Sequence, residues 1–180
     1  MTTLLTRRGF VARTASFGAG LVAASAFPTL ARAAIPPAIY TLQQRSSGRF
    51  LDAWDDGSND WNVVTRPAQG NSSQDWLVTY DDSGAAMATL QQISTGRFLD
   101  AHEIADKDFH AVTRPGPQND KTQIWQTASI GGGYYHLIQQ SSMRLMDAHE
   151  IADRDYGVVT RPAGQTDHTQ DWTLNFVRYA

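Results

Sequence analysis

The most informative absence in this 180-residue sequence is cysteine, of which there is none. Small exported domains often rely on disulfide bonds because their cores are limited, and this chain cannot. Its N-terminal apolar run is shorter than the ~20 residues that a membrane-spanning helix needs, and it is diluted with Gly and Ser. No segment after that run keeps a helical periodicity over the ten or so residues of a helix. The fold must therefore be stabilised by a core of strands.

The first 33 residues have the pattern of an export signal. Arg7-Arg8 follows a short polar start, an Ala/Gly-rich apolar run extends from Phe17 to Leu30, and Ala31-Arg32-Ala33 is a small-x-small cleavage site. The segment resembles a twin-arginine signal, with an uncleaved membrane anchor as the alternative. That resemblance implies folding in the reducing cytoplasm before export, which accounts for the missing cysteine. We expect a periplasmic or extracellular protein with a mature part at 34–180.

Positive charge is scarce in this mature part. The whole sequence has a formal charge of −3, with 15 basic and 18 acidic residues. Removing the signal takes away four arginines and no acid, which leaves a formal charge of about −7. Such a surface is poorly suited to phosphates or anionic lipids. We therefore expect no nucleic-acid partner and no membrane insertion of the mature chain.

One motif occurs three times. Its second copy reads Gly96-Arg97-Phe98-Leu99-Asp100-Ala101-His102-Glu103, then Val112-Thr113-Arg114-Pro115, then Gln123-Ile124-Trp125. The shared Asp falls at positions 52, 100 and 147, so successive copies are offset by 48 and 47 residues. A period of this length predicts a repeat architecture. We place the repeats at about 40–80, 88–128 and 135–176 of a single domain.

Each copy predicts about four short strands, because β-branched and alternating runs are separated by turn-forming residues. Twelve strands in three modules are too few for a propeller, and an open stack would leave bare edges. A closed threefold assembly, the all-β β-trefoil, removes those edges. The expected core consists of Leu42, Leu51, Val64, Trp76, Leu90, Leu99, Val112, Trp125, Leu137, Met146, Val159 and Trp172. The three tryptophans are expected in the core rather than on a ligand-binding surface.

The repeated Gln-x-Trp, at 74–76, 123–125 and 170–172, and the Leu/Met-Asp pairs at 51–52, 99–100 and 146–147 resemble the ricin-type β-trefoil lectins. The likeness covers Tyr40 to about Leu174. It implies a carbohydrate-binding module in which Asp52, Asp100 and Asp147 are sugar ligands and the Gln is a framework residue. The sequence departs from the family where Arg-Pro stands in place of an aromatic ring after the third strand. Ser73, Thr122 and Thr169 likewise stand where the family often has Asn.

Each copy nevertheless holds groups that suit a sugar. A carboxylate accepts from hydroxyls, and a guanidinium offers five donors to hydroxyls, ring oxygens or an acidic sugar's carboxylate. Rings recur two and nine residues after the Asp, as candidate stacking surfaces. The candidate carbohydrate-binding residues are Asp52, Trp54, Trp61 and Arg66, then Asp100, His102, Phe109 and Arg114, then Asp147, His149, Tyr156 and Arg161. As alternatives, the Asp caps a turn, the second ring packs on its hairpin, and the Arg pairs with the Asp of its repeat.

The leading interpretation is a secreted, multivalent lectin without catalysis, whose partners are glycans or a polysaccharide. Asp100 with Glu103 resembles a glycosidase pair, but a pair repeated in shallow copies lacks the single deep cleft of that chemistry. The histidines show no metal-ligand spacing, so we expect neither metal nor cofactor. The alternative function is a protein-interaction β-trefoil of the protease-inhibitor or toxin-partner type, which would use a loop that departs from the threefold pattern.

Overall fold

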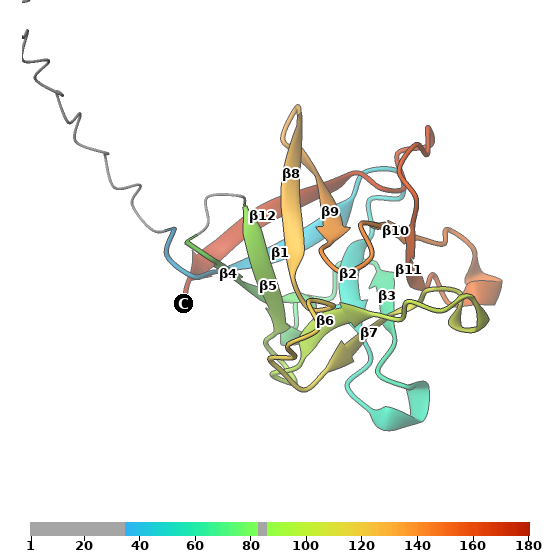
Figure 1. Ribbon diagram of the computed structural model, residues 1–180, viewed down its shortest axis with the longest axis horizontal. Helices are drawn as coiled ribbons and strands as arrows, with labels where there is room; N and C mark the ends of the chain where they lie inside the picture. Colours follow the sequence, from blue (N-terminus) through green and yellow to red (C-terminus); the bar gives the residue numbers. More distant parts are fainter. Residues whose placement is uncertain (1–34, 83–85) are drawn as a thin grey trace, which may run out of the picture. The chain divides into compact units, whose positions relative to one another are not determined.

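A computed structural model describes residues 35–82 and 86–180 (Figure 1). The expected signal peptide, 1–33, lies outside these residues. The first repeat forms β1 (Ala38–Gln44), β2 (Phe50–Ala53), β3 (Val63–Arg66) and β4 (Trp76–Tyr80), with short 3-10 helices η1 (Gly57–Asn59) and η2 (Ser72–Gln74). The second forms β5 (Met87–Gln92), β6 (Phe98–Ala101), η3 (Ala105–Lys107), β7 (Ala111–Arg114) and β8 (Trp125–Gly131). The third forms β9 (Tyr134–Gln139), β10 (Leu145–Ala148), η4 (Ala152–Arg154), β11 (Val158–Arg161) and β12 (Trp172–Tyr179).

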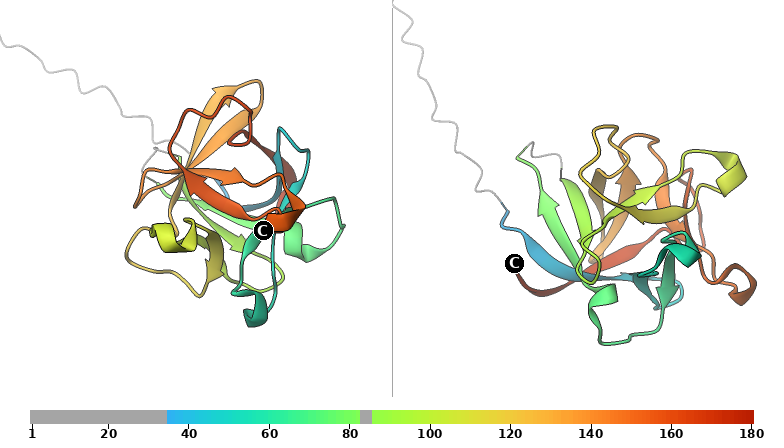
Figure 2. Two further views of the ribbon diagram at one scale, coloured as in Figure 1. Left: turned by 90° about the vertical axis from the view of Figure 1, so that its right-hand side faces the viewer. Right: turned by 90° about the horizontal axis from the view of Figure 1, so that it is seen from below.

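Half of the strands close into a barrel. Antiparallel pairing runs from β1 to β4, β5, β8, β9 and β12, and β12 pairs with β1 again. The other strands form one hairpin per repeat, β2–β3, β6–β7 and β10–β11. The left view of Figure 2 faces the side of the molecule where these hairpins lie and shows the repeats grouped around a common centre. The predicted all-β β-trefoil is thus confirmed. Within residues 35–82 and 86–180, no helix has the length and apolar character to cross a membrane.

The hairpins of different repeats are hydrogen-bonded to one another. The Thr113 N–H donates to the Trp61 carbonyl at 2.9 Å, so the second hairpin contacts the loop of the first repeat. The equivalent bonds, at 3.0 Å, join Thr160 to Phe109 and Thr65 to Tyr156. Each loop that precedes β3, β7 or β11 therefore lies at the junction with the next repeat. The side chains of the loop can contact that neighbouring repeat.

The three repeat tryptophans are fully buried, as predicted. Trp76, Trp125 and Trp172 are each 0% exposed. Their indole Nε1 groups donate to the carbonyls of Leu51, Leu99 and Met146 at 3.2, 3.1 and 3.1 Å. Each of these carbonyls belongs to the residue immediately before a repeat Asp. Each buried indole thus fixes the backbone next to a candidate sugar-binding aspartate. Packing of the core therefore determines the position of that aspartate.

The valines predicted for the core in the third strands are buried as expected, but the residue before each of them is the one that joins the main cluster. The main cluster contains Val63, Ala111 and Val158 rather than Val64, Val112 and Val159. The latter three are also buried, but they lie where the hairpins meet, and Val64 and Val159 form bridges to Gly157 and His110. Side chains alternate between the faces of a strand. Two adjacent apolar residues therefore do not reveal which one faces the barrel.

Candidate functional site

Three buried aspartates occupy equivalent positions in the hairpins. Asp52, Asp100 and Asp147 are 0, 2 and 3% exposed, and each stands between a buried aliphatic residue and a buried alanine. One carboxylate oxygen is held locally: the N–H of Ala53 donates to Asp52 Oδ1 at 2.8 Å, and that of Ala101 to Asp100 Oδ1 at 2.7 Å. This contact is the local capping role that the sequence left open. It fixes the carboxylate and leaves its second oxygen for another partner.

The second oxygen is only partly satisfied. Asp100 Oδ2 accepts from the Thr122 hydroxyl at 3.0 Å, whereas the Oδ2 atoms of Asp52 and Asp147 are buried without a hydrogen-bond partner among the described residues. Burial raises the pKa of all three carboxyl groups above its ordinary value, and nearby hydroxyl and guanidinium groups oppose the shift without cancelling it. An unsatisfied buried acceptor costs about 1–3 kcal/mol. A ligand hydroxyl that reached it would remove this cost.

An arginine lies beside each aspartate and also contacts the ring two residues after it. In the second repeat, Arg114 Nε is 3.7 Å from Asp100 Oδ2, and Arg114 Nη2 donates to His102 Nδ1 at 3.1 Å. Burial lowers the pKa of His102, and the charge of Arg114 lowers it further. The neutral ring therefore carries its proton on Nε2. The equivalent contacts are Arg161 Nε to Asp147 Oδ2 at 3.9 Å, Arg161 Nη2 to His149 Nδ1 at 3.3 Å, and the Arg66 guanidinium 4.1 Å from the Trp54 ring centre.

The second set of candidate rings sits in a strained turn. Asp108 and Phe109 have φ values of 48° and 53°, and the turn is closed by a 3.0 Å bond from the His110 N–H to the Lys107 carbonyl. Two successive left-handed residues are costly unless one is glycine. The same geometry recurs at Asp60-Trp61 and at Asp155-Tyr156.

This turn carries each ring into the next repeat. The Phe109 ring lies under the Arg144 guanidinium at 3.7 Å, and the equivalent pairs are Trp61 with Arg97 at 3.9 Å and Tyr156 with Arg49 at 3.7 Å. The structure therefore brings Asp, Arg and the first ring together within each repeat, but it places the second ring at the neighbour's hairpin. One face of each second ring is covered by a guanidinium, and their contact with sugar stays a prediction.

Two sets of residues at these junctions were missed from the sequence. Arg49, Arg97 and Arg144 each donate to the carbonyl of a threonine in their own hairpin, with the shortest distances at 2.6 Å. Asp108 accepts from His149 Nε2 at 3.2 Å and Asp155 from Trp54 Nε1 at 3.2 Å, across two different junctions. Both sets recur in every copy, as Gly/Met-Arg and as Asp-aromatic pairs. That recurrence could have identified both sets from the sequence.

A surface hollow of about 200 Å³ surrounds the aspartate of the second repeat. Arg114 forms one wall, and Asp120, Thr122 and Gln118 contribute further polar groups. Ile104 also lines the hollow and is 54% exposed, so it offers an apolar surface at the edge of the hollow. A buried carboxylate, polar walls and an exposed apolar side chain are groups that can hydrogen-bond the hydroxyls of a polyhydroxylated ring and pack against its apolar face.

The fold is shared with known β-trefoil proteins, although no protein-family model and no curated sequence matches this chain. The designed threefold symmetric protein ThreeFoil is similar over 77% of this chain and 99% of its own, with 26% identity and a TM-score of 0.66. The agglutinin of Rhizoctonia solani is similar over 82% of this chain and 100% of its own (17% identity, TM-score 0.65). An exo-β-1,3-galactanase of Clostridium thermocellum is similar over 78% of this chain but only 30% of its own (23% identity, TM-score 0.63). These likenesses define the chain as a β-trefoil.

Proposed function

We propose that this chain is an exported, non-catalytic carbohydrate-binding protein with lectin-like sites in its repeats. The observation that carries the proposal is the hollow of about 200 Å³ around Asp100. There a rigid buried carboxylate meets the half-exposed Arg114 and the exposed Ile104. The likeness of the fold to an agglutinin supports the same function.

The chemistry of the hollow suits a sugar with two neighbouring hydroxyls. The Asp100 carboxylate accepts hydroxyl hydrogens, and Arg114 donates to hydroxyl or ring oxygens. Ile104, 54% exposed, offers an apolar surface to the C–H face of the ring. It would serve in place of the aromatic residue that Arg114-Pro115 replaces.

The third repeat carries the same set of groups, which supports more than one site. Asp147, His149, Ile151, Arg161 and Thr169 occupy the positions of Asp100, His102, Ile104, Arg114 and Thr122. Ile151 is 52% exposed. The first repeat has Trp54 and Asp56 where the others have His and Ile, so its site should differ in preference. Two or three weak sites on one rigid body would bind a repetitive glycan with increased avidity.

We propose that the protein is not catalytic because of the way its carboxylates are surrounded. Asp100 is held by Ala101 and Thr122, and Glu103 is exposed at the rim of the hollow. A glycosidase needs its acid and its base on opposite sides of one enclosed bond. The hollow is a surface site rather than an enclosed cleft, and its main polar groups recur in the third repeat, which favours binding. Export by the twin-arginine route is proposed on the pattern of residues 1–33 alone.

A glycan array on the 34–180 chain, followed by calorimetry, tests the proposal. Asp100→Asn combined with Asp147→Asn should abolish most binding to the selected glycan. Asp153→Asn, in an exposed turn of η4, is the matched control and should bind normally. Thermal unfolding of each variant shows that the fold is intact. Full affinity in the double variant would show that these aspartates are not the sugar ligands.

A further inference from the structure

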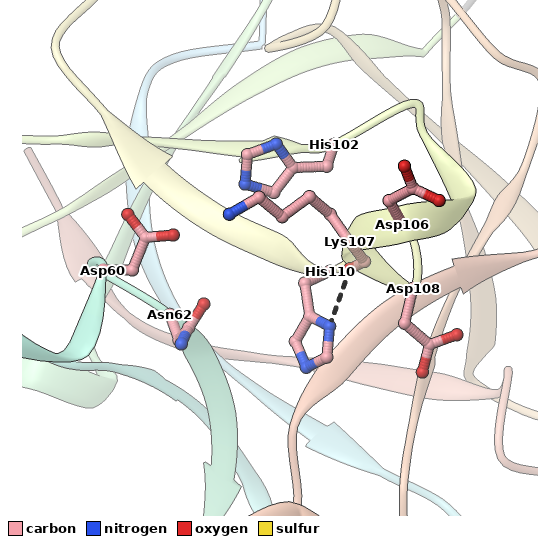
Figure 3. Close-up of a pocket in the computed structure, with 7 residues that line it drawn as sticks. All are labelled: Asp60, Asn62, His102, Asp106, Lys107, Asp108 and His110. Carbon is pink, nitrogen blue, oxygen red and sulfur yellow. Dashed lines mark hydrogen bonds between the residues drawn. The ribbon is translucent and has the colours of Figure 1, made fainter.

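The junction between the first and second repeats holds a second recess that the three-copy pattern does not explain. Two adjoining hollows, of about 300 and 260 Å³, share Asp60, His102 and Lys107 in their linings. Figure 3 shows Lys107 extending from η3 toward the side of the recess where His102 and Asp60 lie. Asp60 comes from the first repeat and the other two from the second. The recess therefore depends on the contact between repeats.

The smaller hollow is strongly cationic in an otherwise acidic chain. Arg97, Lys107 and Arg114 line it, and Asp60 is its only carboxylate. Arg97 donates to the Thr113 carbonyl and lies against the Trp61 ring, and among residues 35–82 and 86–180 it has no ion pair with a carboxylate. Arg114 already lies beside Asp100, but Arg97 and Lys107 still outnumber Asp60 in the smaller hollow, which favours a negatively charged group there rather than in the adjoining hollow, where Asp106 and Asp108 also lie.

At the junction between the second and third repeats the charges at these positions satisfy one another, and at the junction between the third and first repeats Asn59 stands where Lys107 does. Between the second and third repeats, Asp108 accepts from Arg154 at 2.9 Å and from His149 at 3.2 Å. Arg154 occupies the position of Lys107, and Asp108 that of Asp60. Within the described part of the chain, neither Lys107 nor Asp60 forms an ion pair with another residue. The first junction is thus the one where a cation remains free for a ligand.

One N–H group of Arg114 lacks a hydrogen-bond acceptor within the described chain. Its Nε is buried without a hydrogen-bond partner among the described residues, because Asp100 Oδ2 lies 3.7 Å away. Arg114 and His102 line both the cationic hollow and the hollow around Asp100. The two hollows therefore adjoin one another, so one ligand could extend from the hollow around Asp100 into the cationic hollow.

We propose that the cationic hollow binds the carboxylate of an acidic sugar unit, next to a unit held at Asp100. This inference rests on the proposed carbohydrate-binding function and names its ligand class as uronate-containing oligosaccharides. A guanidinium binds a carboxylate through two parallel hydrogen bonds, and a free ammonium adds charge without a fixed geometry. The first junction thereby gives the second repeat a preference that the third repeat lacks.

The probe is a set of glucuronate- and galacturonate-containing oligosaccharides, each paired with its carboxyl-reduced form, measured by calorimetry on the 34–180 chain. At least one acidic member should bind roughly tenfold more tightly than its reduced partner, since one charge-assisted contact has about that effect. Lys107→Gln should remove most of this preference without changing affinity for the reduced form. Arg154→Gln, at the equivalent position of the third repeat, is the matched control and should keep the preference.

The outcomes separate the two proposals. Equal affinity for each acidic oligosaccharide and its reduced partner, or a preference that survives Lys107→Gln, would overturn the acidic site and leave the lectin function standing. Binding of both forms that survives Asp100→Asn with Asp147→Asn would overturn the proposed sugar site instead. Binding of neither form would overturn the acidic site outright. A preference that weakens with added salt, and is lost in Lys107→Gln alone, supports it.

Discussion

The buried carboxylate of the first repeat predicts that Asp52→Asn stabilises the protein. Asp52 is 0% exposed, and its Oδ2 has no hydrogen-bond partner among the described residues. The asparagine keeps an oxygen for the Ala53 N–H, which now lies 2.8 Å from Oδ1. Its new amide group can donate to Ser73 Oγ, which lies beside the carboxyl group and itself donates to Asn71. A buried neutral amide with a partner is less costly than a buried charge without one.

We expect a gain of about 1–2 kcal/mol in the free energy of unfolding at neutral pH, from the cost of an unsatisfied buried group. The loss of a counter-charge for Arg66 offsets little of it, because that side chain is partly exposed. Asp147→Asn should behave in the same way. Asp100→Asn should gain less, since Asp100 Oδ2 already accepts from Thr122.

The pH dependence of stability predicts independently that Asp52→Asn is more stable than the wild type. Burial raises the pKa of Asp52 in the folded protein, so the folded chain holds its proton to a higher pH than the unfolded chain. The free energy of unfolding of the wild type then falls as pH rises from the ordinary Asp range to the raised pKa. The asparagine variant lacks this contribution. Its advantage should therefore widen through that window and become constant above it.

Urea unfolding followed by tryptophan fluorescence, at a series of pH values from acidic to neutral, measures this difference. Contributions from the other carboxylates cancel between the two proteins. A variant that is less stable than the wild type at neutral pH, or an advantage that does not change with pH, would refute the reasoning. It would mean that the second oxygen is satisfied in solution.

Three further predictions concern other parts of the molecule. Met143→Gly should stabilise by roughly 1 kcal/mol in thermal unfolding, because Met143 has φ 59° where Gly48 and Gly96 stand in the other repeats; unchanged or lower stability would contradict this. Burial alone would raise the pKa of Asp171, but hydrogen bonds from His136, His168 and Arg45 outweigh it and lower the pKa. Stability from Asp171 is then present above the ordinary Asp pKa and lost as pH falls toward the lowered value, so Asp171→Asn should flatten the acid limb of the stability profile; an unaltered limb would count against the cluster. Trp125→Phe should cost about 1–3 kcal/mol in urea unfolding, because the Leu99 carbonyl loses its indole partner at 3.1 Å, and a neutral result would show that this bond is replaced.

The fold could be predicted because its signals repeat. Counterparts of Leu42, Leu51 and Trp76 occur in each copy at spacings that differ by at most one residue, and threefold repetition of four strands leaves few closed arrangements. The sequence does not show which side chains of the third strand point into the barrel, since Val63 and Val64 are both apolar. Barrel geometry, rather than composition, decides which of the two enters the main cluster.

The candidate site could be predicted only within a repeat. Asp100, His102 and Arg114 come together as expected, because the two strands of a hairpin hold them side by side. Phe109 does not join them, because the left-handed turn at Asp108 carries it to Arg144 of the next repeat. Contacts between repeats depend on how the modules close, which spacing along the chain does not encode. The absence of an ion pair at Lys107 among the described residues likewise depends on the contact between repeats and could not be predicted from the sequence.

The central claim is that sugars bind at the repeat aspartates, and amide NMR tests it most directly. The N–H of Ala101 donates to Asp100 Oδ1 at 2.7 Å, so its resonance reports on the carboxylate. Titration with a glycan selected from the array should shift the amides of Ala101 and Ala148 and leave that of the core residue Ala88 unchanged. Saturable binding with shifts confined to residues away from Asp100 and Asp147 would contradict the account.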